Sequence, residues 1–396
     1  MTRFVFFAFF WIAYGSIIER IHRPKSDSHR YSPARLQRII RRDAISSFLH
    51  VETTGFNIYL TCHLIEESIC NYALSDLKRA ALRIQGVIYL NEQIRVNVTF
   101  GSFSDSSRTL GYASPNFYVE FHESEDLPWN VDADYLYPAA LARQLAPDES
   151  SLQTSKPDID ATFNSDYNWW FADSYGFARD IDAESEGSKR FDFEQVAIHE
   201  LLHGMGFISG WYTWFGDKHS IPSFPLYSDD GDFKGLAKPF IFDRWVSDAI
   251  HGFWLRDIGK AITEDYRHAA RVANESNATV TWRSVFAASE GAKISAALIQ
   301  AGGPFVTPRA LWSWYPVIEN DAIVFRYAIL YTPAKYTDGS SISHFDDQFY
   351  SSTSHFLMRP FAVEGVGLDG YVPYNKLGPL SEIIIGIFKA IGYSTL

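Results

Sequence analysis

The stretch FDFEQVAIHELLHGMGF, near the middle of the chain, constrains the fold more than any other part of this sequence. It places His199 and His203 four positions apart, with Glu200 directly after the first histidine. Asp192, followed three positions later by Gln195, has the spacing of a capping box, which begins a helix. Because residues at i and i+4 share a helix face, the stretch predicts a helix from Asp192 to about His203 with both imidazoles on one side.

Two imidazoles on one helix face can bind a single zinc ion, and a glutamate beside the first can take a proton from water. The pattern HExxH is typical of zinc proteases. The alternative is a pair of ordinary histidines on an ordinary helix. The preceding strands, a secretory leader and the helix-ending residues Gly204 and Gly206 favour the metal. A catalytic zinc usually has three protein ligands, so a third ligand is needed.

The third ligand does not follow directly in the sequence. The longer pattern HExxHxxGxxH would place a histidine where the chain has Ser209, and serine is a poor zinc ligand. No glutamate occurs from Gly204 to Thr263, which excludes a nearby glutamate ligand. Aspartate ligands stay open, although YSDDGDF also fits a calcium loop or a solvated turn: Asp217, Asp229, Asp230, Asp232 and Asp243. Distant histidines are the other candidates: His219, His251, His268, His344 and His355.

The segment SSISHFDDQFYSSTSHFLMRPF gives His344 a specific neighbourhood. With FDFEQVAIHELLHGMGF, DIDATFNS and the C-terminal IIIGIFKAIGY, it resembles the leishmanolysin-type metzincins. In that family a long insertion separates the HExxHxxG helix from a third histidine in a Ser-His-aromatic segment. A Leu-Met pair, the Met-turn, follows shortly after, as Leu357 and Met358 do here. The chain lacks the many cysteines of leishmanolysin, and its long gap before Met358 leaves His355 as a rival ligand.

This resemblance covers roughly residues 70–210 and 340–393. It implies an α+β, metzincin-like fold: a twisted, mostly parallel sheet with a backing helix and an active-site helix, then a mainly irregular and helical C-terminal subdomain. It implies one catalytic Zn²⁺ and a packing methionine beneath the site. The residues that it implies are His199, His203 and His344 as ligands, Glu200 as general base and Met358 at the Met-turn.

The expected function is therefore that of a secreted, extracellular zinc endopeptidase acting on a protein or peptide substrate, as a monomer. An edge strand within Tyr135–Leu141 would align an extended substrate by strand addition. The alternative is a secreted non-catalytic binding protein, such as an aromatic-rich carbohydrate binder, or an inactive protease relative. The formal net charge of -12 argues against a nucleic-acid partner.

The N-terminus supports the secretory route. One arginine precedes an uncharged run from Phe4 to Ile18, which predicts a signal peptide at residues 1–15, with an uncleaved membrane anchor as the alternative. No later stretch is long and apolar enough to span a bilayer. Secretion makes Cys62 and Cys70 candidates for a disulfide rather than free thiols. Glycosylation sequons begin at three asparagines: Asn97, which lies in a strand-like run, Asn274 and Asn277.

The remaining pattern suggests five segments. After the signal peptide come a basic linker or short propeptide (16–43), an N-terminal catalytic subdomain (44–207), an inserted region (208–342) and a C-terminal subdomain (343–396). Periodicity predicts one helix in Asn71–Leu90 and strands at 94–100, 116–121 and 158–164. Further helices are expected in Asp243–Leu255, in Ser284–Gly302 and between Pro379 and Gly392.

Overall fold

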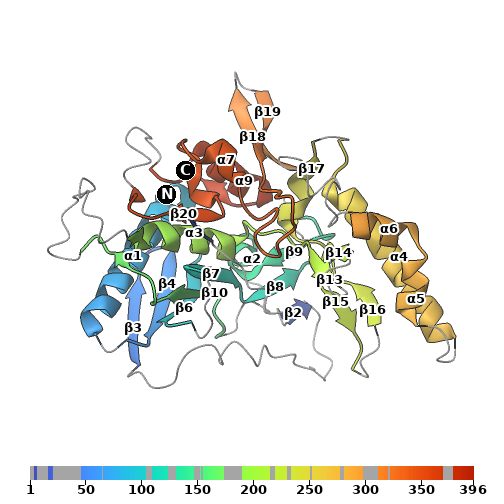
Figure 1. The fold of residues 1–396 in the computed structure, drawn as a ribbon, viewed down its shortest axis with the longest axis horizontal. Coiled ribbons are helices and arrows are strands. Elements are labelled where there is room, and N and C mark those ends of the chain that lie inside the picture. Colours follow the sequence, from blue (N-terminus) through green and yellow to red (C-terminus); the bar gives the residue numbers. More distant parts are fainter. Residues whose placement is uncertain are drawn as a thin grey trace.

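The computed structural model describes most of the chain beyond residue 45 (Figure 1). The described residues are 4–6, 17–20, 46–64, 66–103, 109–123, 131–146, 152, 155–173, 190–214, 219–229, 233–249, 252–276, 281–297, 311–319, 322–368 and 378–396. Of the expected signal peptide and linker, only strands β1 (Phe4–Phe6) and β2 (Ile17–Arg20) are described. The rest of both segments lies outside the described residues, so both remain predictions.

A five-stranded sheet forms the base of the N-terminal half. Its strands, in spatial order, are β3 (Ser47–Glu52), β4 (Phe56–Cys62), β6 (Ile94–Gly101), β10 (Ile159–Asn164) and β7 (Gly111–Pro115). Burial alternates along β4 and β6, so the predictions of strands at 94–100 and 158–164 are confirmed. With its helices, this sheet gives the chain an α+β fold.

The sheet is mixed, which corrects the expectation of a mostly parallel one. Strands β4, β6 and β10 run parallel, whereas the outer strands β3 and β7 are antiparallel to their neighbours. A tight turn joins β3 to β4, with the Thr53 N–H donating to the Phe56 carbonyl at 2.8 Å. Strands joined by such a short turn can pair only antiparallel. The periodicity of a strand carries no information on this direction.

Helix α1 (Glu67–Gln85) packs against the sheet and against α3. Its buried residues recur at helical spacing, including Ala73, Leu77, Ala80 and Ile84. A disulfide joins Cys62 at the end of β4 to Cys70 in the first turn of α1, with 5.9 Å between their Cα atoms. The predicted disulfide is therefore confirmed, and it fastens the backing helix to the sheet.

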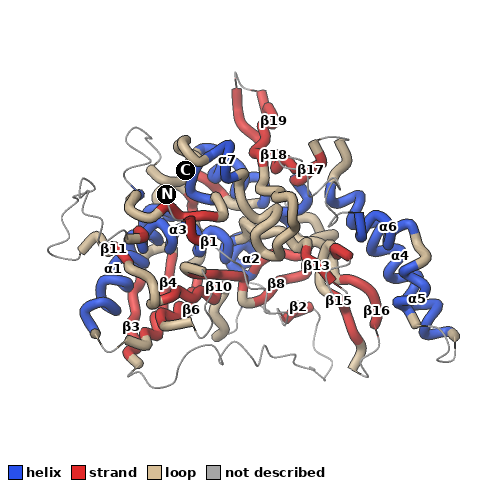
Figure 2. The backbone as a smooth tube through the Cα atoms, viewed as in Figure 1, coloured by secondary structure: helices blue, strands red, loops and turns tan. Residues whose placement is uncertain are grey.

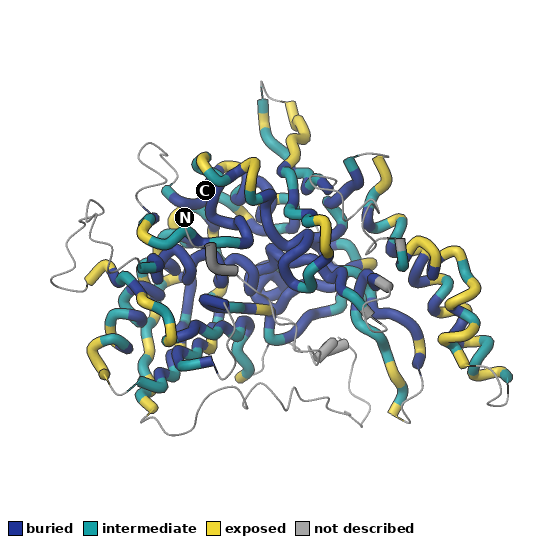
Figure 3. Tube along the Cα trace, viewed as in Figure 1, coloured by how far each residue is buried: buried dark blue, intermediate teal, exposed yellow. Residues whose placement is uncertain are grey.

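Helix α3 (Phe193–Met205) carries the HExxH sequence and is buried along its whole length (Figure 3). The Asp192 carboxylate caps it by accepting the Gln195 N–H at 3.0 Å, so the predicted start is confirmed. The helix ends at Gly206, whose φ of 124° lies in the left-handed region. Gly204, expected to help end the helix, instead lies inside it against β10.

The inserted region differs most from expectation. The predicted helix at Asp243–Leu255 is wrong: a 3₁₀ helix, η3 (Ile241–Trp245), precedes strand β17 (Val246–Asp248), and α4 (Leu255–Glu275) begins only at its end. Pairing of β17 with β18 (Leu311–Glu319) overrides the local helical period. Strand β19 (Ala322–Ile329) completes this sheet as a projecting hairpin with β18 (Figure 1).

The other described elements are short and surround these parts (Figure 2). The helices are α2 (Ala139–Leu145), α5 (Trp282–Ala287), α6 (Glu290–Ala297), α7 (Asp347–Tyr350), η4 (Phe356–Met358) and α9 (Glu382–Ile391). A three-stranded sheet contains β2, β8 (Phe117–Glu120) and β9 (Leu136–Pro138). Paired strands are β1 with β20 (Phe361–Val363), β11 (Trp169–Trp170) with β12 (Phe191–Asp192), β13 (Tyr212–Trp214) with β14 (His219–Ile221), β15 (Pro225–Tyr227) with β16 (Phe233–Leu236), and β5 (Ile88–Tyr89) with β21 (Ser394–Thr395). The expected helix after Pro379 is α9. Up to Ala297, α5 and α6 replace the single helix expected at Ser284–Gly302, and the last five positions of that prediction lie outside the described residues.

Two of the three asparagines that begin glycosylation sequons lie in the described part of the chain. Asn97 lies in β6 but is exposed, and its side-chain amide donates to Asp160 at 3.0 Å. Asn274 is exposed near the end of α4, and Asn277 lies outside the described residues. Glycosylation at all three remains a prediction.

In the described part of the chain, no helix combines the length and apolar character needed to cross a membrane.

Candidate metal centre

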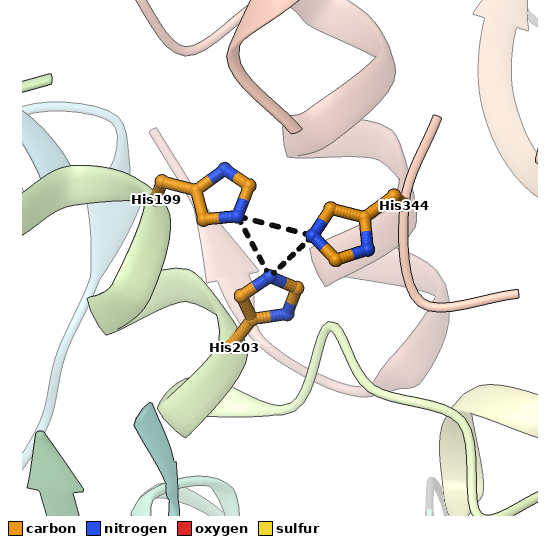
Figure 4. Close-up of side chains that lie close together, drawn as sticks. All are labelled: His199, His203 and His344. Atoms are coloured by element: carbon orange, nitrogen blue, oxygen red, sulfur yellow. Dashed lines mark hydrogen bonds between the residues drawn. The ribbon is translucent and has the colours of Figure 1, made fainter. Parts of the chain in front are cut away.

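Three histidines from two distant parts of the sequence meet at one point (Figure 4). His199 and His203 project from α3, and His344 lies in the segment just before α7. The distance between Nε2 atoms is 2.9 Å from His203 to His199, 3.2 Å from His199 to His344 and 3.3 Å from His203 to His344. All three side chains are fully buried. The structure thus brings together His344, rather than His355, with the two α3 histidines.

Backbone carbonyls fix the orientation of each imidazole. His199 Nδ1 lies 2.7 Å from the Leu357 carbonyl, His203 Nδ1 lies 2.7 Å from the Phe207 carbonyl, and His344 Nδ1 lies 2.9 Å from the Ser340 carbonyl. A carbonyl can only accept a hydrogen bond, so each Nδ1 must carry the proton. Each Nε2 therefore presents its lone pair to the point that the three rings share. Metal-ligating histidines commonly have this arrangement.

The donor set fits a tetrahedral cation such as zinc. Ligand nitrogens bound tetrahedrally at usual zinc–nitrogen lengths lie about 3.3 Å apart, close to the three Nε2 separations of 2.9, 3.2 and 3.3 Å. Burial lowers the pKa of His199 to about 4 and lowers the pKa values of His203 and His344 well below the usual range. All three imidazoles are therefore neutral near pH 7, which is the form that binds metal.

Glu200, the residue that follows His199 on α3, carries a buried carboxylate. It is fully buried, and burial raises its pKa well above the ordinary value for glutamate, while the backbone of Ala113 lowers it in part. Among the described residues, neither carboxylate oxygen has a hydrogen-bond partner of regular geometry. Burying an unsatisfied carboxylate is costly, and such strongly shifted acids concentrate at functional sites. Glu200 is thus the buried acid that the sequence predicted next to His199.

Strand β7 supplies the backbone that faces Glu200. The Leu110 carbonyl accepts the N–H of Asn164 in β10, and the Asn116 N–H donates to the carbonyl of Asp158, just before β10. The backbone groups of the even-numbered residues of β7 therefore face β10. Ala113, an odd-numbered residue, directs its backbone groups to the opposite edge, where its effect on Glu200 is found. An edge strand was expected within Tyr135–Leu141, and β9 (Leu136–Pro138) does lie at the edge of the sheet formed by β2, β8 and β9, whereas α2 begins at Ala139. These residues are buried, and alignment of a substrate by β9 stays a prediction.

The segment with Met358 contacts both His199 and the residue that follows His344. Met358 is fully buried in η4, and its carbonyl accepts the Phe345 N–H at 2.8 Å. The next residue after His344 is thereby tied to the predicted Met-turn, and the Leu357 carbonyl holds His199. Ile342, two residues before His344, has a φ of 71°, which is rare for a β-branched residue. Such strain is typical of segments that their surroundings hold in place.

The rival ligands lie elsewhere. His355 is partly buried, with its ring centroid 5.9 Å from that of Tyr350, and does not join the three-histidine cluster. Asp243 instead accepts the Ser209 hydroxyl at 2.6 Å and the Gly210 N–H at 2.8 Å. Outside the cluster, the described candidates also include Asp229 and the exposed His268, whereas the side chain of His219 lies outside the described part of the chain. The candidates outside the described residues are Asp217, Asp230, Asp232 and His251.

A family model described as SPBPB7E8-like matches residues 19–233, which is more than half of the 396-residue chain. The chain belongs to this family. It is also 23% identical, over 397 residues, to an uncharacterized protein of Schizosaccharomyces pombe. The alignment covers 90% of this chain and 65% of that relative, so the chain spans less than two thirds of its length. No solved structure gives a significant match. The matched family range contains His199 and His203, whereas His344 lies beyond it.

In this member of the SPBPB7E8-like family, Gly204 sets how closely α3 approaches β10. A Cβ added at Gly204 would lie 2.3 Å from Cγ2 of Ile159. We expect Gly204→Ala to lower the free energy of unfolding by about 1–3 kcal/mol, because one of the two packed elements must shift. Urea denaturation measures this loss. In the double variant Gly204→Ala/Ile159→Ala the cost should be smaller than the sum of the single costs, and strict additivity would contradict the direct clash.

Proposed function

We propose that this protein is a zinc-dependent endopeptidase similar to the leishmanolysin-type metzincins, with its third histidine ligand displaced by the inserted region. The observation that carries the proposal is the convergence of three neutral imidazoles. His199, His203 and His344 each present Nε2 to one point while a backbone carbonyl holds Nδ1. The buried Glu200 beside them supports a hydrolytic role over a purely structural metal site. Secretion, through a signal peptide, is part of the same proposal.

The three histidines would hold the ion, and Glu200 would handle the proton. A bound zinc supplies Lewis acidity, which lowers the pKa of water and polarises a peptide carbonyl. Glu200, ionised in the working enzyme, accepts a proton from the attacking water and then donates it to the leaving amine. The Ala113 backbone favours the ionised carboxylate, since it lowers the pKa that burial raises. Met358 would serve as packing beneath the site and not as a ligand, as the resemblance implies.

Zinc content and peptide cleavage test the proposal together. We expect purified protein to contain one zinc per chain and to cleave a mixed peptide library, with cleavage lost on adding a chelator and restored by zinc. Wild-type protein that contains no zinc would contradict the proposal. Protein with zinc but no cleavage would favour the alternative of an inactive relative or a binding protein.

The ligand assignment has its own prediction. His344→Ala removes one of three ligands, so we expect the zinc content after dialysis to fall to a small fraction of the wild-type value. His355→Ala is the matched control, because His355 does not join the cluster, and it should keep full zinc content. Metal analysis by atomic emission reports both. The opposite pattern, with loss only in His355→Ala, would reassign the third ligand.

A further inference from the structure

Within the inserted region, a buried aspartate contacts the segment that leaves α3. Asp243, in η3, is fully buried and accepts the Ser209 hydroxyl at 2.6 Å and the Gly210 N–H at 2.8 Å. The Ser209 oxygen in turn accepts the Trp211 N–H at 3.2 Å. One carboxylate therefore organises three consecutive residues just after the helix that carries His199 and His203. Hydrogen bonds to a buried carboxylate are among the stronger ones in proteins.

The same segment also touches the residue next to the third histidine. The Ser209 N–H donates to the Ser343 hydroxyl at 3.1 Å, and Ser343 directly precedes His344. Both serines are almost fully buried, so water does not compete freely for this bond. Two hydrogen bonds thus link Asp243 to Ser209 and Ser209 to Ser343, and Ser343 is joined to His344 by the peptide bond.

Aromatic contacts join the same segments of the chain. The Phe207 ring lies 5.0 Å from Phe242 and 5.2 Å from Phe345, between ring centroids. Phe242 neighbours Asp243, and Phe345 neighbours His344. The polar chain and the aromatic contacts therefore join the same three segments: the exit of α3, η3 and the third-histidine segment.

We infer that Asp243 is a positioning residue for the three-histidine site: it fixes Ser209, which holds Ser343 and so sets the position of His344 relative to α3. This inference rests on the proposed function in that the positioned group is a metal ligand. It assigns Ser209, which stands at the position of the third histidine in the unsplit pattern, the role of holding Ser343. It also assigns the middle of the inserted region a role in completing the site.

Zinc affinity measured by competition with a chromophoric chelator tests the inference on the full-length chain. Loss of a group that orients a ligand typically weakens metal binding by about 10–100-fold. We expect Asp243→Ala to raise the zinc Kd by about that factor. Asp243→Asn keeps a carbonyl oxygen for the Gly210 N–H and an amide that can bond Ser209, so it should restore most of the affinity. A Kd for Asp243→Ala within twofold of wild type would overturn the inference, as would Asp243→Asn being as weak as Asp243→Ala.

Asp265→Ala is the matched control. Asp265 also accepts a backbone N–H across two elements of the inserted region, that of Gly291 at 2.6 Å, but it belongs to α4 and lies outside the chain of bonds. A general loss of stability should appear in both variants, whereas a change in Kd should appear only in Asp243→Ala. Equal changes in Kd would show that the effect is merely structural.

Ser343→Ala tests the route itself. If Asp243 acts through Ser209 and Ser343, the double variant Asp243→Ala/Ser343→Ala should bind zinc about as weakly as the weaker single variant. Additive losses would overturn the route. Should Asp243→Ala fail to fold, Ser209→Ala and Ser343→Ala carry the same comparison with smaller changes.

Hydrogen exchange on metal-free protein separates this inference from the proposed function. We expect amides in residues 340–346 to exchange faster in Asp243→Ala than in wild type, and to be unchanged in Asp265→Ala. If wild type binds no zinc, the proposed function fails, and exchange alone then decides whether Asp243 positions this segment. Unchanged exchange in Asp243→Ala would overturn the positioning role.

Discussion

Replacing Glu200 with glutamine is expected to lower kcat for peptide cleavage by about 10²–10⁴-fold, the usual contribution of a positioned acid or base. Glutamine has nearly the same shape but cannot accept and return a proton near pH 7. The substitution also removes a buried carboxylate whose pKa is raised by burial. The fold should therefore be kept or stabilised while catalysis is lost. Zinc content should equal that of wild type, since the three imidazoles are untouched.

Steady-state kinetics with a fluorogenic peptide, together with metal analysis, check this result. Glu194→Gln is a suitable control, because it makes the same chemical change on the same helix. Glu194 bonds Arg83 on α1 rather than neighbouring the histidines in sequence. Its loss should affect stability and leave kcat close to wild type. If Glu200→Gln cleaves as well as wild type, another group is the base and the mechanism is wrong.

The second large effect concerns stability. Arg143 donates two hydrogen bonds to the buried Asp158 carboxylate, from Nε at 2.9 Å and from an Nη at 2.7 Å. Asp158 also accepts the Arg95 N–H at 2.8 Å, so it joins α2, β6 and the start of β10. Arg143→Met leaves a buried charge without its cation, which typically costs about 3–5 kcal/mol. Chemical denaturation followed by circular dichroism should show a drop of this size.

Two comparisons identify the cause of that drop. Arg95→Met removes a partly exposed guanidinium whose Nε lies 3.9 Å from Asp158, and it should cost less than about 1 kcal/mol. In Arg143→Met/Asp158→Asn the buried charge is gone, so part of the lost stability should return. A double variant less stable than Arg143→Met would contradict the proposed origin in the unpaired carboxylate.

The parts of the fold that local sequence determines were predictable. The Asp192 cap, the helix that follows it and the ending at Gly206 depend on residues within one short stretch. The residue periodicity at 94–100 and 158–164 similarly predicted β6 and β10. Their side chains alternate between a buried face and a less buried face of the sheet. The disulfide was predictable because the sequence contains only two cysteines and a secretory leader was expected.

Features that depend on distant contacts were not predictable from local pattern. The run around Trp245 has a helical period, but β17 forms there because β18, far along the chain, pairs with it. His344 was selected among five histidines through its neighbours Ser343, Phe345 and Met358, and not through any spacing from His203. The bonds from Asp243 to Ser209 had no local signal at all, because their partners are 34 residues apart.

The displaced histidine makes the site a product of long-range chain closure. His203 and His344 are 141 residues apart, and bringing together the ends of a flexible chain of that length costs roughly 4 kcal/mol of entropy. In an unsplit HExxHxxGxxH motif these two histidines would be six residues apart, and the same relation gives a cost of roughly 1.6 kcal/mol. Contacts of such separation form late in folding, because they stabilise the chain only after the long loop between them has closed. A ligand that binds all three histidines favours the closed chain by mass action, so occupancy of the site and order in the inserted region are thermodynamically linked.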